Sequence, residues 1–438
     1  MNVIFWLVGT LVVVLGPIIL IHELGHFIFA KLAGVRVEEF GFGFPPRLLK
    51  LWHGKGYLEI GTTRVTIPAG LRSPPRLEVG TRVDAVAQQL DDDTYVLRHL
   101  TVLDSDAEYR EHASETAHED LHLRGELTTL EAGTLYSLNL LPMGAFVKMT
   151  GEEDPSDLRS LAAQPKRWRV AIMAAGPLLN IIVAFMLLVG AYTTGFPDRW
   201  LVEVTSVEPG TAAEEAGLQP ADVILAVGGE RIKDGMEQLR SIIRAAPEQT
   251  VELMVLRGEE TLTLTATPRS TPEGYGLLGI MMAPWPDRSA LRHYSLPEAL
   301  SAGTTDITAA ILMTVQVPAL LARGDMTPQE ARPASMVGIS EILAISLQQS
   351  IEWGLAFRVL QTASLISLAL GLTNLLPLPA LDGGHILFVL IEAVRGRRIS
   401  PRYEQIFHSV GLVILVSLMA WVMFQDLINP IIPWSLLR

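Results

Sequence analysis

Four long apolar segments constrain the fold more than any other feature of this sequence. They run, in chain order, over Val3–Ala30, Val170–Tyr192, Leu355–Leu376 and Ile406–Phe424. A helix that crosses the ~30 Å hydrocarbon core of a bilayer needs about 20 mostly apolar residues, and these segments approach or exceed that length. The first is not a signal peptide, because it is too long and lacks a basic start and a small-residue cleavage site. We therefore expect a polytopic α-helical membrane protein with about four transmembrane helices.

Basic residues beside these segments predict their orientation, because loops rich in Lys and Arg stay in the cytoplasm. Three loops carry them: Lys31, Arg36, Arg47 and Lys50 after the first segment, Lys166, Arg167 and Arg169 before the second, and Arg395, Arg397, Arg398 and Arg402 between the third and fourth. The two termini and residues 195–352 are then expected on the outer side of the membrane.

The charge balance and the lack of cysteine exclude several classes of protein. With 34 Lys and Arg against 47 Asp and Glu, the net charge is -13, and we expect no nucleic-acid partner. The chain has no cysteine, which excludes disulfide scaffolds, thiolate nucleophiles and zinc sites built on cysteine. Any metal must therefore be held by His, Asp or Glu.

The outward segment contains a folded domain at Val202–Pro268. The stretches VEVTSV and TVELMVL alternate apolar and polar residues as half-buried strands do, and PGTAAEEAGLQPADVILAVGGERI lies between them. This pattern resembles a PDZ domain, which implies binding of an extended peptide, such as a C-terminal peptide, at a sheet edge. A small α+β domain without a ligand is the alternative. The amphipathic stretch Pro297–Leu321 is expected to lie on the membrane surface.

The inward segment, residues 34–166, combines predicted strands with a long acidic insertion. GFGF at Gly41–Phe44 and TLYSLNLLPMGAFVKM at Thr134–Met149 alternate and carry glycines, as membrane-associated β-strands would. The insertion, about residues 55–132, is interpreted as a solvated region, with partner binding as an unsupported alternative. Its fold does not follow from the sequence.

The pattern His-Glu-x-x-His occurs twice, and on a helix it places two imidazoles one turn apart, where both can bind zinc. The copies are His22–His26 and His118–His122. The second lies among acidic residues, where a charged helical face explains it. The first ends a membrane span, where ionisable residues cost several kcal/mol unless they are paired or coordinated. We therefore predict His22 and His26 as zinc ligands and Glu23 as the general base.

Zinc needs a further protein ligand, and the third apolar segment offers Asp382 within LGLTNLLPLPALDGGHI. Pro377 and Pro379 exclude a continuous helix there, and broken backbone inside a membrane is tolerated only where protein or a watery cavity surrounds it. Asp382 is the predicted third ligand. His385 is the competitor, with a supporting or helix-start role as its other interpretation.

HELGH, LDGG and a PDZ-like domain between them together resemble the site-2 protease family, in its bacterial PDZ-containing branch. GFGF, LPMGAFVKMTGEE, AAGPLLNIIVA and NLLPLPALDGGH support this in order and spacing. The resemblance implies a four-span zinc metalloprotease, with one Zn²⁺ per chain, in the bacterial inner membrane. Its substrates would be single-span membrane proteins embedded in the bilayer, such as anti-sigma factors or signal-peptide remnants. The PDZ domain would be extracytoplasmic and the active site would open toward the cytoplasm.

The resemblance also assigns residues. The positions matching His22, His26 and Asp382 bind zinc, the one matching Glu23 is the catalytic base, and Asn374 helps to hold substrate in an extended form. We predict a substrate-binding strand edge at Gly41–Phe44 and Ala145–Met149, in which Gly41, Phe42, Gly43, Ala145, Phe146 and Val147 are the candidate contacts.

Seven regions follow along the chain. The expected boundaries are 1–33 for the first transmembrane helix, 34–166 for the strands with the insertion, 167–194 for the second helix, 195–270 for the PDZ domain, 271–350 for a linker with the amphipathic helix, 351–396 for the third segment and 397–438 for the fourth helix and tail. The sequence departs from the family at Ala334–Ser340, where ASMVGIS replaces a Gly-Pro, and in the length of the insertion. A catalytically silent PDZ adaptor, or a zinc-dependent chaperone or sensor, is the alternative function.

Overall fold

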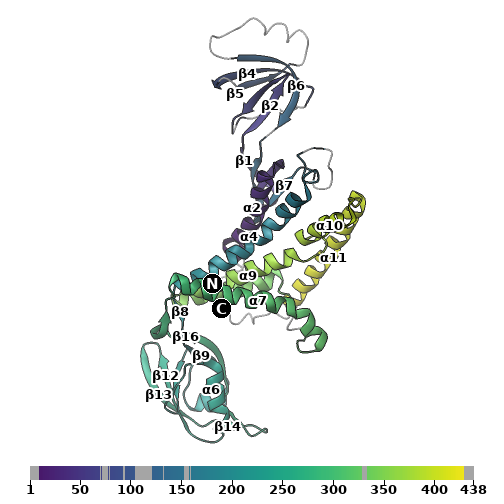
Figure 1. The fold of residues 1–438 in the computed structure, drawn as a ribbon. Coiled ribbons are helices and arrows are strands. Elements are labelled where there is room, and N and C mark those ends of the chain that lie inside the picture. Colours follow the sequence, from purple (N-terminus) through teal and green to yellow (C-terminus); the bar gives the residue numbers. More distant parts are fainter. Residues whose placement is uncertain are drawn as a thin grey trace. The chain divides into compact units, whose positions relative to one another are not determined.

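The computed structural model describes residues 9–69, 71, 77, 79–91, 94–103, 121–131, 133–151, 157, 159–327 and 333–428. The chain divides into two compact units, and each is described by itself. The first combines Met1–Met186, Ile307–Leu347 and Thr362–Arg438, and the second combines Leu187–Asp306 with Gln348–Gln361. The labels of Figure 1 are used throughout.

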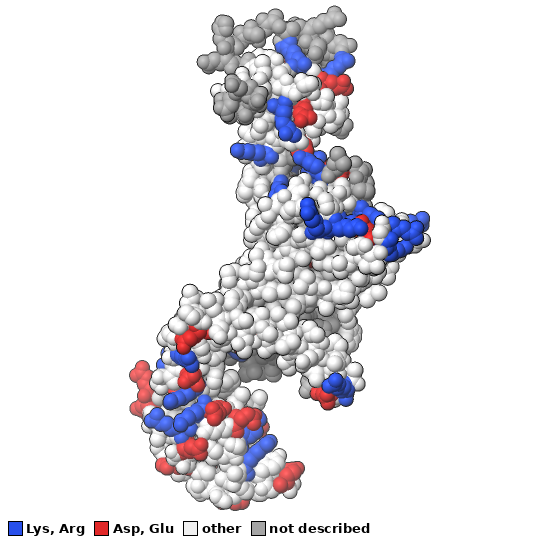
Figure 2. Space-filling model, in the orientation of Figure 1, with Lys and Arg blue, Asp and Glu red and all other residues white. Residues whose placement is uncertain are grey.

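Among the described residues, four helical stretches are long and apolar enough to cross a membrane: Leu11–Leu32 (η1 and α2), Lys166–Thr193 (α4), Leu296–Arg323 (α7) and Pro401–Asp426 (in α11). Three of them coincide with predicted spans. The α7 stretch was expected on the membrane surface instead, and that placement stays a prediction. Charged side chains are sparse over the helices on the face in Figure 2, and basic ones gather where α10 ends and α11 begins.

The third predicted span forms a helix, α9 (Phe357–Leu375), but α9 is not among these four candidates. Arg358, Gln361 and Asn374 lower its hydropathy the most, and its two serines are used in packing. Ser364 Oγ donates to the carbonyl of Ala184 at 2.6 Å, and Ser367 Oγ donates to the carbonyl of Asn180 at 2.9 Å. The polar residues of α9 therefore attach it to α4. The other helices of this region are α8 (Met336–Trp353), α10 (Asp382–Arg395) and α11 (Pro401–Ile428).

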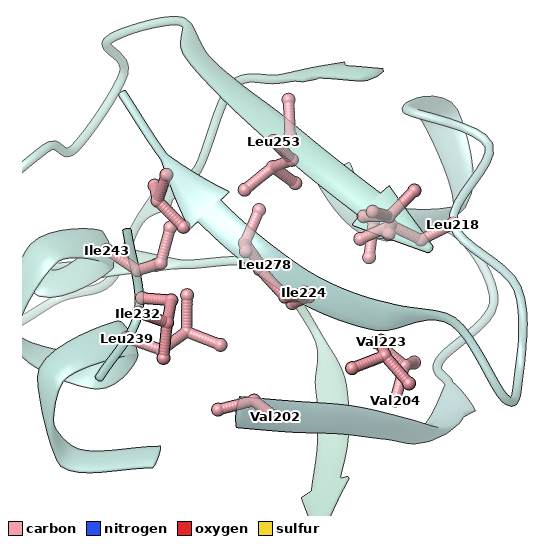
Figure 3. Packing of buried hydrophobic residues seen from close by; sticks show 14 of the residues in the cluster. Val202, Val204, Leu218, Val223, Ile224, Ile232, Leu239, Ile243, Leu253 and Leu278 are labelled. Atoms are coloured by element: carbon pink, nitrogen blue, oxygen red, sulfur yellow. The ribbon is translucent and has the colours of Figure 1, made fainter. Parts of the chain in front are cut away.

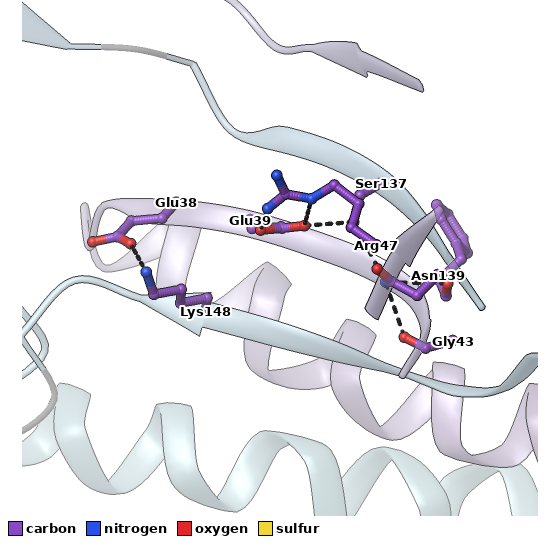
Figure 4. A network of polar contacts seen from close by, with 8 residues as sticks. Glu38, Glu39, Gly43, Arg47, Ser137, Asn139 and Lys148 are labelled. Atoms are coloured by element: carbon purple, nitrogen blue, oxygen red, sulfur yellow. Dashed lines mark hydrogen bonds and ion pairs between the residues drawn. The ribbon is translucent and has the colours of Figure 1, made fainter. Parts of the chain in front are cut away.

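Strands β1 (Val37–His53) and β7 (Leu135–Met149) pair antiparallel, and both bend back on themselves. Arg47 donates to Glu39 across the bend in β1, Ser137 Oγ donates to Glu39 Oε1 at 2.6 Å, and Asn139 Nδ2 donates to the carbonyl of Gly43 at 3.1 Å (Figure 4). Burial raises the pKa of Glu39, but the bonds from Arg47 and Ser137 outweigh it and leave the pKa below its ordinary value. A charged network thus holds the bend.

The predicted strand edge needs a correction. Gly41 pairs with Phe146 on one side and with Ser137 on the other, and Phe42 pairs with Ala145 and Leu138. The predicted segments therefore do lie side by side, but Gly41 and Phe42 are inner positions and cannot be an open edge. Among the described residues, the segment Ala145–Met149 is paired on one side only, with β1.

The insertion folds into a closed barrel in the order β2-β3-β5-β4-β6 (Figure 1). Alternating residues such as Val83, Ala85 and Ala87 point inward with Leu58 and Leu97, and they form the barrel's own core. The strands are β2 (Gly56–Ile60), β3 (Thr63–Ile67), β4 (Arg82–Asp91), β5 (Thr94–Val102) and β6 (Leu121–Glu131). A region expected to be merely solvated thus has a hydrophobic centre.

The second unit contains a sheet with the antiparallel order β13-β12-β10-β9-β16, and β11 pairs with β10. In β12, Leu253 and Val255 point into the core while Glu252 and Met254 point out, as the alternation in TVELMVL predicts. Helix α6 adds Leu239 and Ile243, four residues apart, to the same core (Figure 3). The alternation of apolar and polar residues therefore correctly predicts which side chains of β12 are buried.

The elements of this unit extend past the predicted boundary at 270, since β16 joins the sheet. Their bounds are β8 (Phe196–Pro197), β9 (Trp200–Val207), α5 (Ala212–Glu215), β10 (Val223–Val227), β11 (Glu230–Arg231), α6 (Gly235–Arg244), β12 (Val251–Arg257), β13 (Glu260–Ala266), β14 (Arg269–Ser270), β15 (Gly276–Leu277), β16 (Ile280–Pro286), η3 (Arg288–Ala290) and β17 (Leu291–Arg292).

Candidate active site

His22 and His26 lie one turn apart on the buried face of α2 (Gly16–Leu32). Both side chains are more than nine-tenths buried, with 9% of the His22 side chain and 8% of the His26 side chain exposed. Close packing against α4 causes this burial, because a Cβ at Gly25 would lie 2.6 Å from the carbonyl oxygen of Ala175. The small residue lets α2 and α4 lie side by side (Figure 1), and both histidines are buried.

Asp382 is the first residue of α10, where a carboxylate is favoured by the partial positive charge of a helix N-terminus. The loop between α9 and α10 contains Pro377 and Pro379, and Ala380 has a positive φ of 64°. A Cβ at Gly383 would collide with the carbonyl oxygens of this loop. The prolines and glycine of LPLPALDGG therefore bring Asp382 back toward α2, as the sequence predicts.

Three atoms converge between these elements. Asp382 Oδ2 lies 3.2 Å from His22 Nε2 and 3.4 Å from His26 Nε2, and the two Nε2 atoms are 3.2 Å apart. Ligands about 2.0–2.1 Å from a tetrahedral zinc ion lie about 3.3 Å from one another. The triangle of donor atoms therefore fits zinc, and Asp382 Oδ2 is buried without a hydrogen-bond partner.

The far side of each imidazole supports this arrangement. His26 Nδ1 lies 2.8 Å from the carbonyl oxygen of Ile172, to which it donates, so its Nε2 presents a lone pair. His22 Nδ1 lies 3.2 Å from the amide of Asn180, whose Oδ1 is buried and unpartnered. An amide turned by 180° satisfies both groups, with Nδ1–H of His22 donating to Oδ1 of Asn180. Two lone pairs and a carboxylate then face each other, an arrangement that a cation between them stabilises.

Glu23 follows His22 on α2 and is partly buried. Its carboxylate lies near the backbone of Val147 in β7. Strand β7 also packs on α2, where a Cβ at Gly144 would lie 2.6 Å from Ile19. Glu23 therefore lies beside the histidines and directly beside the unpaired side of Ala145–Met149.

His385 does not join this site. Its ring stacks on that of His408 at 3.8 Å between centroids, and its Nδ1 lies 3.9 Å from Glu404 Oε1. His408 in turn accepts a hydrogen bond at 3.0 Å from the backbone N–H of Ala380. His385, the alternative candidate for the third zinc ligand, thus belongs to a second cluster, which supports the loop that precedes Asp382.

Asn374 and the second His-Glu-x-x-His copy are the remaining predicted residues. Asn374 is in α9, and its Nδ2 donates to the carbonyl of Leu370 in the same helix at 3.0 Å. His118, from the second His-Glu-x-x-His copy, lies outside the described residues, and His122 lies in strand β6. Because His122 lies in a strand, the expected helical face is wrong for His122.

Two residues near the histidines were not predicted from the sequence. A Cβ at Gly176 of α4 would collide with Nε2 of His26, and Asn180, one turn later, faces His22. Both residues lie in the stretch AAGPLLNIIVA, which carries the family resemblance. An unusual Gly and Asn in an otherwise apolar span was the available signal.

Comparisons with known proteins agree with this geometry. The model of peptidase family M50 matches residues 10–61 and 126–418, leaving most of the barrel unmatched. The zinc metalloprotease RasP of Oceanobacillus iheyensis is 29% identical over 95% of this chain and 97% of its own. The regulator of sigma-W protease RasP of Bacillus subtilis is 29% identical with the same coverage.

A solved structure, the PDZ domain of an SdrC-like protein from Listeria monocytogenes, covers 19% of this chain and 86% of its own, at 20% identity and a TM-score of 0.18. At that score the PDZ interpretation of Val202–Pro268 stays a prediction. The family model, by contrast, spans well over half of the chain. The chain therefore belongs to peptidase family M50 and is a zinc metalloprotease.

Proposed function

We propose that this protease hydrolyses peptide bonds within the transmembrane segments of other membrane proteins, with one zinc ion per chain held by His22, His26 and Asp382. The observation that carries the proposal is the convergence of three buried donor atoms, 3.2–3.4 Å apart, from the apolar helices α2 and α10. A buried site between long apolar helices favours a substrate that is itself embedded in the bilayer.

Zinc bound there supplies Lewis acidity, which polarises the scissile carbonyl and makes water nucleophilic near neutral pH. Glu23 removes the proton from the attacking water and later delivers it to the leaving amine nitrogen. Ile172 and Asn180 hold the two imidazoles so that Nε2 of each faces the metal position. Burial of His22 and His26 excludes bulk water from this position.

A helical substrate must unwind before its carbonyl is attacked, and its freed backbone groups then need partners. The unpaired side of Ala145–Met149 offers them next to Glu23, so the substrate would add a strand there. Phe146 and Val147 are the contacts on this edge, while Gly41, Phe42 and Gly43 support it from the neighbouring strand. Asn374 would assist by exchanging its bond to Leu370 for one to the substrate.

The partners and location follow from the family and from the basic loops. Single-span proteins are the proposed substrates, including anti-sigma factors, in keeping with the relative named as a regulator of sigma-W protease. The chain would lie in the bacterial inner membrane, with the active site open to the cytoplasm. The β9–β16 domain would face outward and act as a size filter or bind newly cut C-termini.

The test is Glu23→Gln in the purified full chain, with cleavage of a single-span reporter protein and zinc content measured together. We expect cleavage to fall by about 10²–10⁴-fold, because that is the typical contribution of proton transfer by a general base. Zinc content should stay at one per chain. The matched control is His118→Ala with His122→Ala, which should keep both cleavage and zinc.

Two outcomes would contradict the proposal. Full cleavage by the Glu23→Gln variant would exclude Glu23 as the base. Loss of zinc in the His118→Ala, His122→Ala variant would transfer the metal site to the second motif.

A further inference from the structure

A cavity of ≈ 430 Å³ opens where α2 ends and the barrel begins. Small-molecule sites occupy about 300–1,000 Å³, so its size is that of a ligand pocket. It lies wholly within the first unit, away from the three donor atoms of the active site. Its lining comes from the end of α2, the start of β1, strands β2 and β3, the end of β6 and the segments that follow β6 and β7. The lining residues are Lys31, Gly34, Val35, Arg36, Val37, Lys55, Gly56, Tyr57, Arg64, Thr66, Glu131, Gly133, Thr134 and Arg159.

The lining is strongly basic. Its cationic members are Lys31, Arg36, Lys55, Arg64 and Arg159. Glu131 is the acidic member among the lining residues, and it is already paired with Arg159. Arg64 is also paired, with Glu59 Oε1 at 3.2 Å from its Nε. Lys31, Arg36 and Lys55 still leave the lining with an excess of positive charge, which repels cations and concentrates anions.

The basic side chains are held in place around Tyr57. The guanidinium carbon of Arg64 lies 3.8 Å from the centre of the Tyr57 ring, and Arg159 donates to the Tyr57 hydroxyl at 3.5 Å. Lys31 Nζ donates to Thr134 Oγ1 at 2.6 Å, and Thr134 is itself anchored to the carbonyl of Val37 at 2.9 Å. Two guanidinium groups and an ammonium are therefore oriented before any ligand arrives.

The tendency of loops rich in Lys and Arg to stay in the cytoplasm does not explain why these basic side chains gather around one cavity. Lys and Arg set the orientation of a span wherever they lie in the adjoining loop. Here the basic residues come from positions as distant as Lys31 and Arg159, and the fold brings them to one cavity. The backbone N–H of Arg36 donates to the carbonyl of Arg159 at 3.0 Å, which fixes these two segments together.

We propose that this cavity binds a phosphate group at the membrane surface. Phosphate suits it because guanidinium groups bind phosphate oxygens through paired, charge-assisted hydrogen bonds, with lysine adding a point charge. The cavity adjoins the end of the Leu11–Leu32 stretch, so the headgroups of a bilayer that this helix crossed would lie beside it. An anionic phospholipid headgroup and free phosphate share this chemistry, and the experiment separates them. The site is independent of the proposed catalytic roles.

The experiment uses the full chain, purified in neutral detergent and titrated with short-chain phosphatidylglycerol by calorimetry. We expect saturable binding that weakens about fivefold in Lys55→Gln, which removes one lining charge. Arg98→Gln is the matched control, because it removes one exposed charge from β5 of the same barrel, outside the cavity. Its affinity should equal that of the unaltered chain.

Inorganic phosphate is then added as a competitor. Displacement of the lipid at millimolar phosphate identifies the phosphate group itself as the ligand. Binding that phosphate does not displace identifies the whole lipid headgroup. The proposal is overturned if phosphatidylglycerol and phosphate both fail to bind, or if Lys55→Gln and Arg98→Gln weaken binding equally, and neither result bears on proteolysis.

Discussion

Two clusters of metal-capable side chains meet on α10, and they are built differently. One consists of His22, His26 and Asp382, and the other of His385, Glu404 and His408. Each offers two imidazoles and one carboxylate, and in each cluster the ligand atoms lie within 4.8 Å of one another. Composition and proximity therefore do not distinguish a metal site from a structural cluster.

The direction of the nitrogen lone pairs does distinguish them. The rings of His22 and His26 are at 78° to one another, and their Nε2 atoms face each other. The rings of His385 and His408 are stacked at 9°, so their lone pairs lie in parallel planes and do not meet at one point. Nδ1 of His408 is also occupied by the N–H of Ala380. The second cluster is therefore suited to hold the loop before Asp382.

The largest expected effect comes from removing the carboxylate of each cluster in turn. Asp382→Asn should lose zinc and proteolysis together, because it removes an anionic ligand and leaves two imidazoles. Glu404→Gln, a change of the same size in the second cluster, should keep zinc at one per chain. Metal analysis of the two purified variants checks this. If Asp382→Asn kept zinc and Glu404→Gln lost it, the metal site would be the cluster of His385, Glu404 and His408.

Gly176→Ala tests whether Nε2 of His26 faces open space for a metal. The added methyl group would collide with Nε2, and such overpacking costs about 1–3 kcal/mol. We expect zinc affinity and cleavage to fall at least ~10-fold while helix content is unchanged. Gly190→Ala on the same helix is the control, since the nearest atom lies 3.9 Å from its Cβ. Equal zinc affinity in both variants would place the metal elsewhere.

Some residues of the metal site can be predicted from the sequence and others cannot. The difference is whether a residue's role depends on its neighbours in the sequence or on contacts between distant segments. The pairing of His22 with His26 depends on helical spacing alone, so a local pattern suffices to find it. The convergence of Asp382 was inferred because a carboxylate and broken backbone within an apolar segment are costly unless a site uses them. Asn180 and Gly176 escaped notice because their roles depend on how closely α4 approaches α2.

The strand region shows where local pattern reading fails. Alternation identified the strands around Gly41 and Phe146, but not that β1 and β7 bend so that Gly41 has partners on both sides. That bend depends on the bond from Arg47 to Glu39, between residues whose contact no periodicity records. The barrel was hidden for a similar reason. The acidic residues of the insertion dominated its composition, although Val83, Ala85 and Ala87 alternate inward in β4.

The smallest effect is expected from His408, which acts on the metal site only through the loop. His408→Ala removes the acceptor for the N–H of Ala380, two residues before Asp382, and we expect zinc affinity to fall about 10-fold, as for other residues that support metal ligands. His408→Asn should restore most of it, because Oδ1 of Asn takes nearly the position of Nδ1. The measurement is competition with a zinc chelator, compared with thermal unfolding. A merely structural role would lower the melting temperature of both variants without the rescue of zinc affinity. If the second cluster itself bound a metal, His408→Ala would instead lower the number of metal ions per chain. Recovery of zinc affinity in His408→Asn therefore distinguishes support of the loop from a merely structural role and from a second metal site.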